Sequence, residues 1–190
     1  MNLKNIENST LNICYVESQT DPNEFKYFFD NIINLRQEMS KFINLTVVAK
    51  TVKDENLKEL RKRVRSVSIY SSIDQNSFLD NLKDIELGII VSTDQFAILD
   101  PSIFFVANGI AVLCHENSGD SRLSSSKIFQ YKTKQDFSDK LSAIINNKDL
   151  LKDYFDNLDE VTPQFVEECV KEDDINKNLF SNNLLSGRTR

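Results

Sequence analysis

The stretch that decides the fold is LGIIVSTDQFAILDPSIFFVANGIAVLC, residues 87–114. Two short apolar runs flank a segment in which Pro101 lies near the start of a helical pattern and Gly109 follows its end. Proline suits the first turn of a helix, and glycine suits the position just after its last turn. The stretch therefore predicts a strand at Leu87–Val91, a helix at Pro101–Asn108 and a second strand at Ile110–Cys114.

The same alternation of strand and helix continues on both sides. Further strand-like runs are Leu11–Val16, Leu45–Ala49, Val67–Tyr70 and Lys127–Tyr131. A long amphipathic helix is predicted at Pro22–Met39, with Asp21 as its cap, because its Phe, Ile and Leu residues recur at helical spacing. Other helical patterns are Asp54–Arg63, Asp74–Leu82, Asp136–Asn146, Leu150–Phe155 and Pro163–Lys171.

This order predicts an α/β fold. Short apolar strands without polar alternation indicate a mostly parallel sheet that is covered on both faces. Right-handed crossovers then give a doubly wound, Rossmann-like sheet of five to six strands. We expect residues 1–175 to form one domain with C-terminal helices, and the polar residues 176–190 to form a flexible tail.

Composition and charge narrow the function classes. The chain has 190 residues and a net charge of −6, which gives no electrostatic case for nucleic acid as a partner. No apolar run approaches the length that spans a bilayer, and the N-terminus lacks the apolar core of a signal peptide. The three cysteines are far apart, so we expect reduced structural thiols in a cytoplasmic protein and no metal site.

Polar residues follow the predicted strands, at the edge where ligands bind in doubly wound sheets. These segments are Glu17–Asp21, Lys50–Thr51, Ser71–Asp74, Ser92–Asp94 and His115–Gly119. The turn after the first strand has no glycine, and no Walker-type motif is present, so flavin, nicotinamide and P-loop nucleotides are disfavoured. No Ser-His-Asp triad is indicated either.

Three features of this sequence each have two possible interpretations. His115 is either a general base or a partly exposed loop histidine. Asp94 and Asp100 are either paired carboxylates, or Asp100 caps the helix that begins at Pro101. The basic stretch Lys58–Arg65 is either a solvated helix face or a contact for an acidic partner or a phosphate.

Three segments resemble the C-terminal, nucleotide-sugar-binding half of GT-B-fold glycosyltransferases. They are VRSVSIYSSIDQNSFLDNLKDIELGIIVST, PSIFFVANGIAVLC and KTKQDFSDKLSAIINNKDLLKDY, and the resemblance extends over residues 11–154. It implies that the helix ending at Gly109 lies beside the donor. In the family that helix carries an acidic residue that binds the ribose, where this chain has Phe104, and a proline follows where it has Ala111. The basic pair that holds the donor diphosphate after the first strand is replaced by Glu17, Ser18, Gln19 and Asn23.

The resemblance implies a glycosyltransferase-like, donor-binding domain. We expect the domain to belong to a system that builds surface glycans or glycosylates protein, and to be inactive alone. One alternative is a non-catalytic accessory subunit that pairs with an active glycosyltransferase or another protein. Another is a receiver- or flavodoxin-like regulatory domain. No catalytic residue and no cofactor is assigned, and a nucleotide-sugar is the expected small-molecule partner. Its candidate contacts are Ser71, Ser72, Ser92, Thr93, Asp94, Phe96, Asp100, Ser102 and His115.

Overall fold

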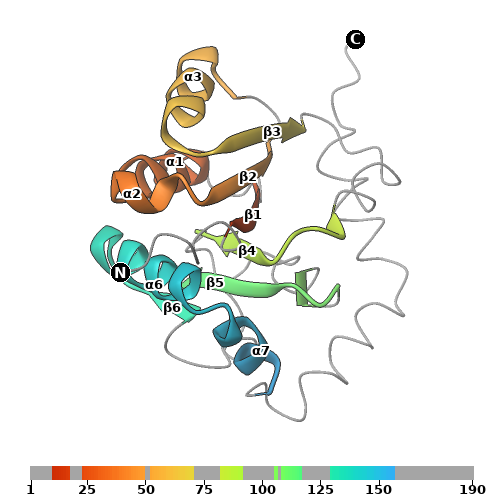
Figure 1. Ribbon diagram of the computed structural model, residues 1–190. Helices are drawn as coiled ribbons and strands as arrows, with labels where there is room; N and C mark the ends of the chain where they lie inside the picture. Colours follow the sequence, from red (N-terminus) through yellow and green to blue (C-terminus); the bar gives the residue numbers. More distant parts are fainter. Residues whose placement is uncertain are drawn as a thin grey trace.

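A computed structural model describes residues 10–17, 23–49, 52–70, 82–91, 105–106, 108–116 and 129–156. Its centre is a six-stranded sheet in which every neighbouring pair is parallel (Figure 1). The strands are β1 (Leu11–Val16), β2 (Ile43–Val48), β3 (Ser66–Tyr70), β4 (Leu87–Ile90), β5 (Ala111–His115) and β6 (Gln130–Tyr131). The predicted α/β class and parallel sheet are confirmed.

The strand order in the sheet is β3-β2-β1-β4-β5-β6. This is the doubly wound order of a Rossmann-like sheet, and it differs from the 2-1-3-4-5 order of receiver and flavodoxin domains. The receiver-like alternative is therefore wrong in its topology. Strands β1 and β4 lie side by side, with Cys14 opposite Gly88. The order of the strands reverses between these two, so a ligand site is expected at their carboxyl ends.

The segment predicted as one helix at Pro22–Met39 forms two helices, α1 (Glu24–Ile33) and α2 (Gln37–Ser40). The side-chain amide of Asn34 donates to the carbonyl of Asp30 at 2.6 Å, at the position where α1 ends. Arg36 is extended, with φ −58° and ψ 132°, and Leu35 between them is buried in the core. The helical spacing of apolar residues thus continues across a break in the helix, and at this break the Asn34 side chain hydrogen-bonds the Asp30 carbonyl.

The remaining described helices are α3 (Asp54–Arg63), α6 (Lys134–Asn146) and α7 (Asp149–Asp156). The prediction placed the start of α6 at Asp136, which is two residues late. The hydroxyl of Thr133 accepts from the backbone N–H of Asp136 at 3.2 Å, so Thr133 is the N-cap. Helix α1 packs beside α3 and α6, and α7 contacts β5 and α6 (Figure 1).

Only part of the deciding stretch is described. Residues Phe105 and Val106 are helical, and Gly109 has φ 72°, as expected of a glycine that ends a helix. The rest of the predicted helix at Pro101–Asn108, apart from Asn108, lies outside the described residues. So do the helices predicted at Asp74–Leu82 (except Leu82) and Pro163–Lys171, and the tail.

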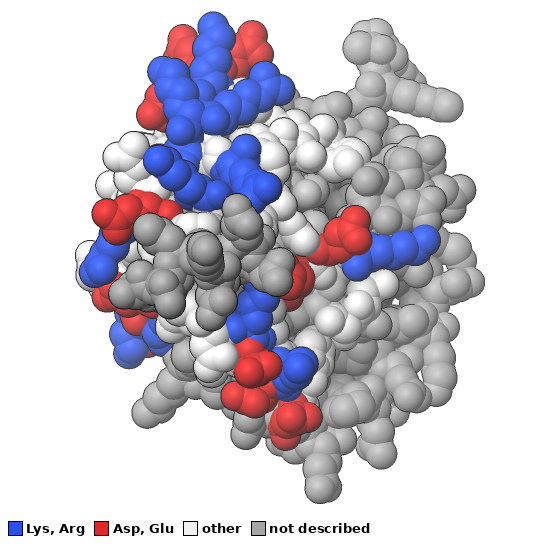
Figure 2. Space-filling model, in the orientation of Figure 1, with Lys and Arg blue, Asp and Glu red and all other residues white. Residues whose placement is uncertain are grey.

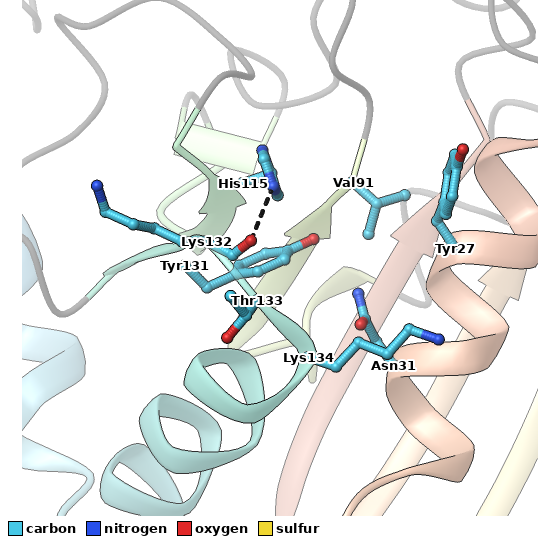
Figure 3. Close-up of a pocket in the computed structure, with 8 residues that line it drawn as sticks. All are labelled: Tyr27, Asn31, Val91, His115, Tyr131, Lys132, Thr133 and Lys134. Carbon is cyan, nitrogen blue, oxygen red and sulfur yellow. Dashed lines mark hydrogen bonds between the residues drawn. The ribbon is translucent and has the colours of Figure 1, made fainter.

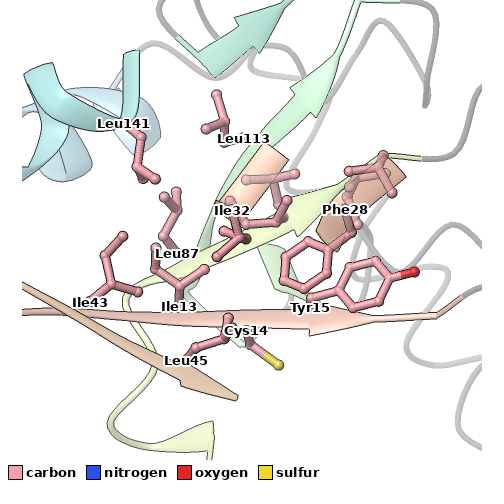
Figure 4. Close-up of a cluster of buried hydrophobic side chains, with 14 of the residues drawn as sticks. Ile13, Cys14, Tyr15, Phe28, Ile32, Ile43, Leu45, Leu87, Leu113 and Leu141 are labelled. Atoms are coloured by element: carbon pink, nitrogen blue, oxygen red, sulfur yellow. The ribbon is translucent and has the colours of Figure 1, made fainter. Parts of the chain in front are cut away.

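The core lies between the sheet and the helices. Ile13, Leu45 and Leu87 from neighbouring strands meet Ile32 of α1 and Leu141 of α6, all nearly or fully buried (Figure 4). The ring of Tyr15 stacks on that of Phe28 with centroids 4.0 Å apart and planes at 6°. This contact fixes α1 over the carboxyl half of β1, and so sets one wall of the site described below.

The amino ends of the strands are tied together by a polar ladder of Asn12, Asn44, Ser66, Glu86 and Lys148. The Asn44 amide donates to Asn12 Oδ1 at 2.9 Å, and the Ser66 hydroxyl donates to Asn44 Oδ1 at 2.7 Å. Lys148 Nζ donates to Glu86 Oε1 at 2.7 Å and to the carbonyl of Thr10 at 2.6 Å. Glu86 Oε2 accepts from the backbone N–H of Asn12 at 3.0 Å. This end of the sheet is therefore closed, and the opposite end carries the cavity.

Candidate functional site

A cavity of about 250 Å³ lies at the carboxyl ends of β4, β5 and β6 (Figure 3). Val91 follows β4, while His115 and Tyr131 are the last residues of β5 and β6. Helix α1 supplies the opposite wall, and the start of α6 supplies the floor. The eight lining residues are Tyr27, Asn31, Val91, His115, Tyr131, Lys132, Thr133 and Lys134.

The position of this cavity follows from the topology. The carboxyl ends of parallel strands meet at one edge, and the chain then turns into helices whose N-termini also face that edge. α1 begins close after β1, and α6 begins close after β6. The cavity therefore combines three strand ends with two helices, α1 and α6, that pack against each other.

His115 lies between the end of β5 and the turn that follows β6. Its Nε2 is 3.3 Å from the carbonyl oxygen of Lys132, and its ring meets that of Tyr131 edge-on at 5.3 Å (Figure 3). Lys132 thus contributes its backbone to the lining, and the imidazole is fixed by two neighbours. Such a ring can hydrogen-bond a hydroxyl of a ligand, whereas a general-base role needs a substrate proton that the structure does not place.

Tyr131, the last residue of β6, also lines the cavity. Its hydroxyl donates to the carbonyl of Ile90 at 3.3 Å, and its ring packs edge-on against Phe137 at 5.0 Å. Burial, with the nearby Cys114 as a smaller cause, raises the pKa of the Tyr131 phenol well above its ordinary value. Tyr131 is therefore a neutral, rigid platform at physiological pH.

Each of the two lysines at the cavity has a carboxylate partner. Lys134 Nζ lies 2.9 Å from Asp30 Oδ2, and Lys132 Nζ pairs with Glu116. Figure 3 shows the ammonium of Lys132 directed away from Val91 and that of Lys134 directed toward Asn31. The hydrogen bond and charge of Glu116 raise the pKa of Lys132, which keeps that side chain protonated. The ammonium groups of both lysines are therefore held in ion pairs.

Tyr27 completes the wall on α1. Its side chain is 50% exposed and is the one large exposed hydrophobic side chain among the described residues. Asn31 lies one turn further along the same helix and is almost fully buried. An exposed aromatic ring at a cavity mouth offers a flat face on which a sugar or a base can stack.

Of the predicted site residues, the structure places His115 at this cavity. The other eight predicted contacts lie outside the described residues, namely Ser71, Ser72, Ser92, Thr93, Asp94, Phe96, Asp100 and Ser102. Phe104, which holds the position of the family's acidic residue, also lies outside them.

Sequence reasoning missed the seven other lining residues. A signal was present at Thr133 and Asp136, because a threonine followed three residues later by an acidic residue marks a helix start. That signal places the turn after β6 at the ligand edge. No comparable signal marked Tyr27 or Asn31, since both fit the polar face of an amphipathic helix.

Among the described residues, no group of three or more His, Cys, Asp or Glu side chains is arranged to hold a metal ion. Cys14 is buried and Cys114 is half-buried, and neither forms a disulfide bond. Within the described ranges, no helix has the length and apolar character needed to cross a membrane.

Solved structures provide the comparison for this fold. The chain is similar to the catalytic domain of cholesterol-α-glucosyltransferase from Helicobacter pylori, with a TM-score of 0.56 and 14% identity, over 85% of this chain and 98% of that one. It is also similar to WaaG, a glycosyltransferase involved in lipopolysaccharide biosynthesis, with a TM-score of 0.60 and 13% identity. Both are glycosyltransferases, and this chain has their fold.

The match to WaaG covers 93% of this chain but 46% of that one. This chain therefore spans about half the length of WaaG. No model of a known protein family matches the sequence. No curated protein sequence matches it either.

Proposed function

We propose that this chain is the nucleotide-sugar-binding domain of a glycosyltransferase system that builds a surface glycan or glycosylates protein. The observation that carries the proposal is the cavity at the carboxyl edge of the sheet, in a fold shared with two glycosyltransferases. The cavity lies near the reversal of strand order, where doubly wound sheets bind their ligands. The donor lies along this edge, with His115 and Tyr27 among its contacts.

Turnover requires a second half. In this proposal an acceptor-binding half comes from another subunit or from further chain, which the coverage of 46% of WaaG supports. The same coverage also supports the alternative of an accessory subunit that pairs with an active glycosyltransferase. Co-purification of a glycosyltransferase with the tagged chain from its native cell supports both forms of the proposal.

Calorimetric titration with UDP-, GDP- and dTDP-sugars tests donor binding directly. Binding of one of these ligands, with loss of affinity on replacing His115 by alanine, supports the donor-binding function. Lack of binding at millimolar concentration by every ligand in the panel contradicts it, and the accessory function then remains.

A further inference from the structure

Two lysines belong to the cavity lining, yet the charges of both are compensated. The two lysines add two positive charges, and their partners Asp30 and Glu116 add two negative charges. An anion drawn to Lys134 must also approach Asp30, whose carboxylate is 2.9 Å from the ammonium. Repulsion between like charges at 4 Å is about 1 kcal/mol in water and about 4 kcal/mol near a protein surface, which offsets most of the attraction.

The other lining groups suit an uncharged, hydroxyl-rich ligand. Tyr27 offers an exposed ring face, and the side chains of His115 and Asn31 offer hydrogen-bonding groups. Sugars bind proteins through such a combination, because their C–H faces pack on aromatic rings and their hydroxyls both donate and accept hydrogen bonds. A volume of about 250 Å³ lies just below the usual range for drug-sized ligands, as suits one sugar unit.

We infer that this cavity binds the neutral sugar part of a ligand, and that Asp30 determines this specificity by masking Lys134 from phosphate. The inference rests on the proposed function, and it deepens that function by assigning the sugar, not the diphosphate, to the edge formed by β5, β6 and α1. The carboxylate of Asp30, which repels phosphate, lies next to the side chains that bind the sugar. Discrimination against phosphate then comes from repulsion by a carboxylate.

The first test uses the whole chain and methyl α-D-glucopyranoside as a neutral probe. We expect amide NMR shifts on titration to centre on residues 131–134 and on α1. Tyr27→Ala should weaken this binding at least fivefold, because the stacking face is lost. Since the Tyr27 side chain is exposed, we expect the fold to be retained. Shifts elsewhere, or an unchanged affinity in the Tyr27→Ala variant, would overturn the inference.

The second test uses pyrophosphate as the anionic probe. Asp30→Asn leaves Lys134 without its carboxylate, so we expect pyrophosphate affinity to rise at least tenfold and to fall again in high salt. The control is Asp149→Asn, which frees Lys152 from a similar exposed pair at 3.5 Å on α7, away from the cavity lining. Equal pyrophosphate affinity in the unmodified chain and in Asp30→Asn would show that the carboxylate does not mask the lysine, and would overturn the inference.

The two proposals fail separately. If a nucleotide-sugar binds but the neutral glucoside does not perturb the cavity, the inference fails and the proposed function stands. If the glucoside binds in the cavity and no nucleotide-sugar binds, the proposed function fails and the sugar site stands.

Discussion

The ring of Phe105 lies directly over the α-carbon of Gly88. A Cβ placed on Gly88 would be 2.4 Å from Cδ2 of Phe105, a distance that real Cβ atoms essentially never show. Gly88 lies at the middle of the β1–β4–β5 pairing, opposite Cys14 and Val112, and Phe105 is fully buried. The absence of a side chain on Gly88 therefore lets the helical turn at Phe105 pack close to the sheet.

Gly88→Ala should lower the free energy of unfolding by about 1–3 kcal/mol, because the methyl group forces the buried ring of Phe105 to move. Chemical denaturation measures the change. Adding Phe105→Leu should recover part of the loss, since a smaller side chain leaves room for the methyl group.

Gly109→Ala provides the comparison. Nothing lies within 4 Å of a Cβ at Gly109, so its cost comes from φ 72° alone and should be about 1 kcal/mol. An equal cost for both alanine variants, or no recovery in the double variant, would contradict the role of the Gly88–Phe105 contact.

Lys148 should contribute measurably to stability through its half-buried contacts. Lys148→Met removes the donors to Glu86 and Thr10 while it keeps the aliphatic stem, and we expect a loss of about 1–3 kcal/mol. A double-mutant cycle with Glu86→Gln isolates the pairwise part. Lys152→Met is the matched control, since its pair with Asp149 is exposed and should contribute at most about 1 kcal/mol.

Cys14 should resist alkylation in the folded protein. Burial raises the pKa of its thiol well above the ordinary value, so the reactive thiolate is almost absent. Native-state labelling with iodoacetamide, followed by peptide mass spectrometry, should modify the half-buried Cys114 well before Cys14. Labelling of Cys14 at the rate of Cys114 would contradict the burial of β1.

Stability should fall at alkaline pH because of Tyr15 and Tyr131. Burial is the main cause that raises both pKa values, with the charge of Glu24 adding to the effect at Tyr15. Unfolded tyrosines lose their protons near pH 10 while the folded ones keep them, so the stabilisation is complete below that pH and declines above it. Each tyrosine should remove about 1.4 kcal/mol per pH unit beyond pH 10.

Urea denaturation at pH 9 to 11 measures this slope. Tyr131→Phe should make the slope shallower, although it also removes the hydrogen bond to Ile90 and costs about 1 kcal/mol at neutral pH. An unchanged slope in this variant would show that Tyr131 ionises equally in both states.

The sequence was sufficient for the centre of the sheet because strands β1, β4 and most of β5 are buried on both faces. Leu11–Val16 was predicted with its observed bounds, and β2 to β5 differ from their predicted ranges by one or two residues. Continuous apolar runs of this kind leave a parallel strand as the natural interpretation. Where a side-chain hydrogen bond decided the outcome, as at Asn34 and Thr133, periodicity alone placed the helix ends wrongly.

The site was less accessible to sequence reasoning. His115 was found because it directly follows an apolar strand, and strand ends are where ligands bind. Lys132 and Lys134 were not found, because their role depends on Glu116 and Asp30, and Lys134 and Asp30 are 104 residues apart. Pairing at that distance depends on how α1 and α6 pack, which no local pattern encodes.

The largest group of basic side chains in Figure 2 lies over α3, which contributes no residue to the cavity lining. Figure 2 shows Lys and Arg side chains gathered over α3, whose last turn contains Arg61, Lys62 and Arg63. Lys62 pairs with Glu59 at 3.5 Å, and both are more than half exposed. These contacts fit the solvated-face interpretation, and cations at a helix C-terminus also favour its dipole.

The polar ladder at the amino ends of the strands has a consequence for folding during synthesis on the ribosome. Lys148 and the carbonyl of Thr10 are separated by 138 residues along the chain, and Lys148 and Glu86 by 62. During synthesis, the hydrogen bonds of Lys148 to Thr10 and Glu86 can therefore form only after the whole of α6 has left the ribosome. Contacts between such distant residues slow folding, because a long loop must close first. Protection of nascent chains from protease should consequently appear late and in one step, after residue 148 has emerged.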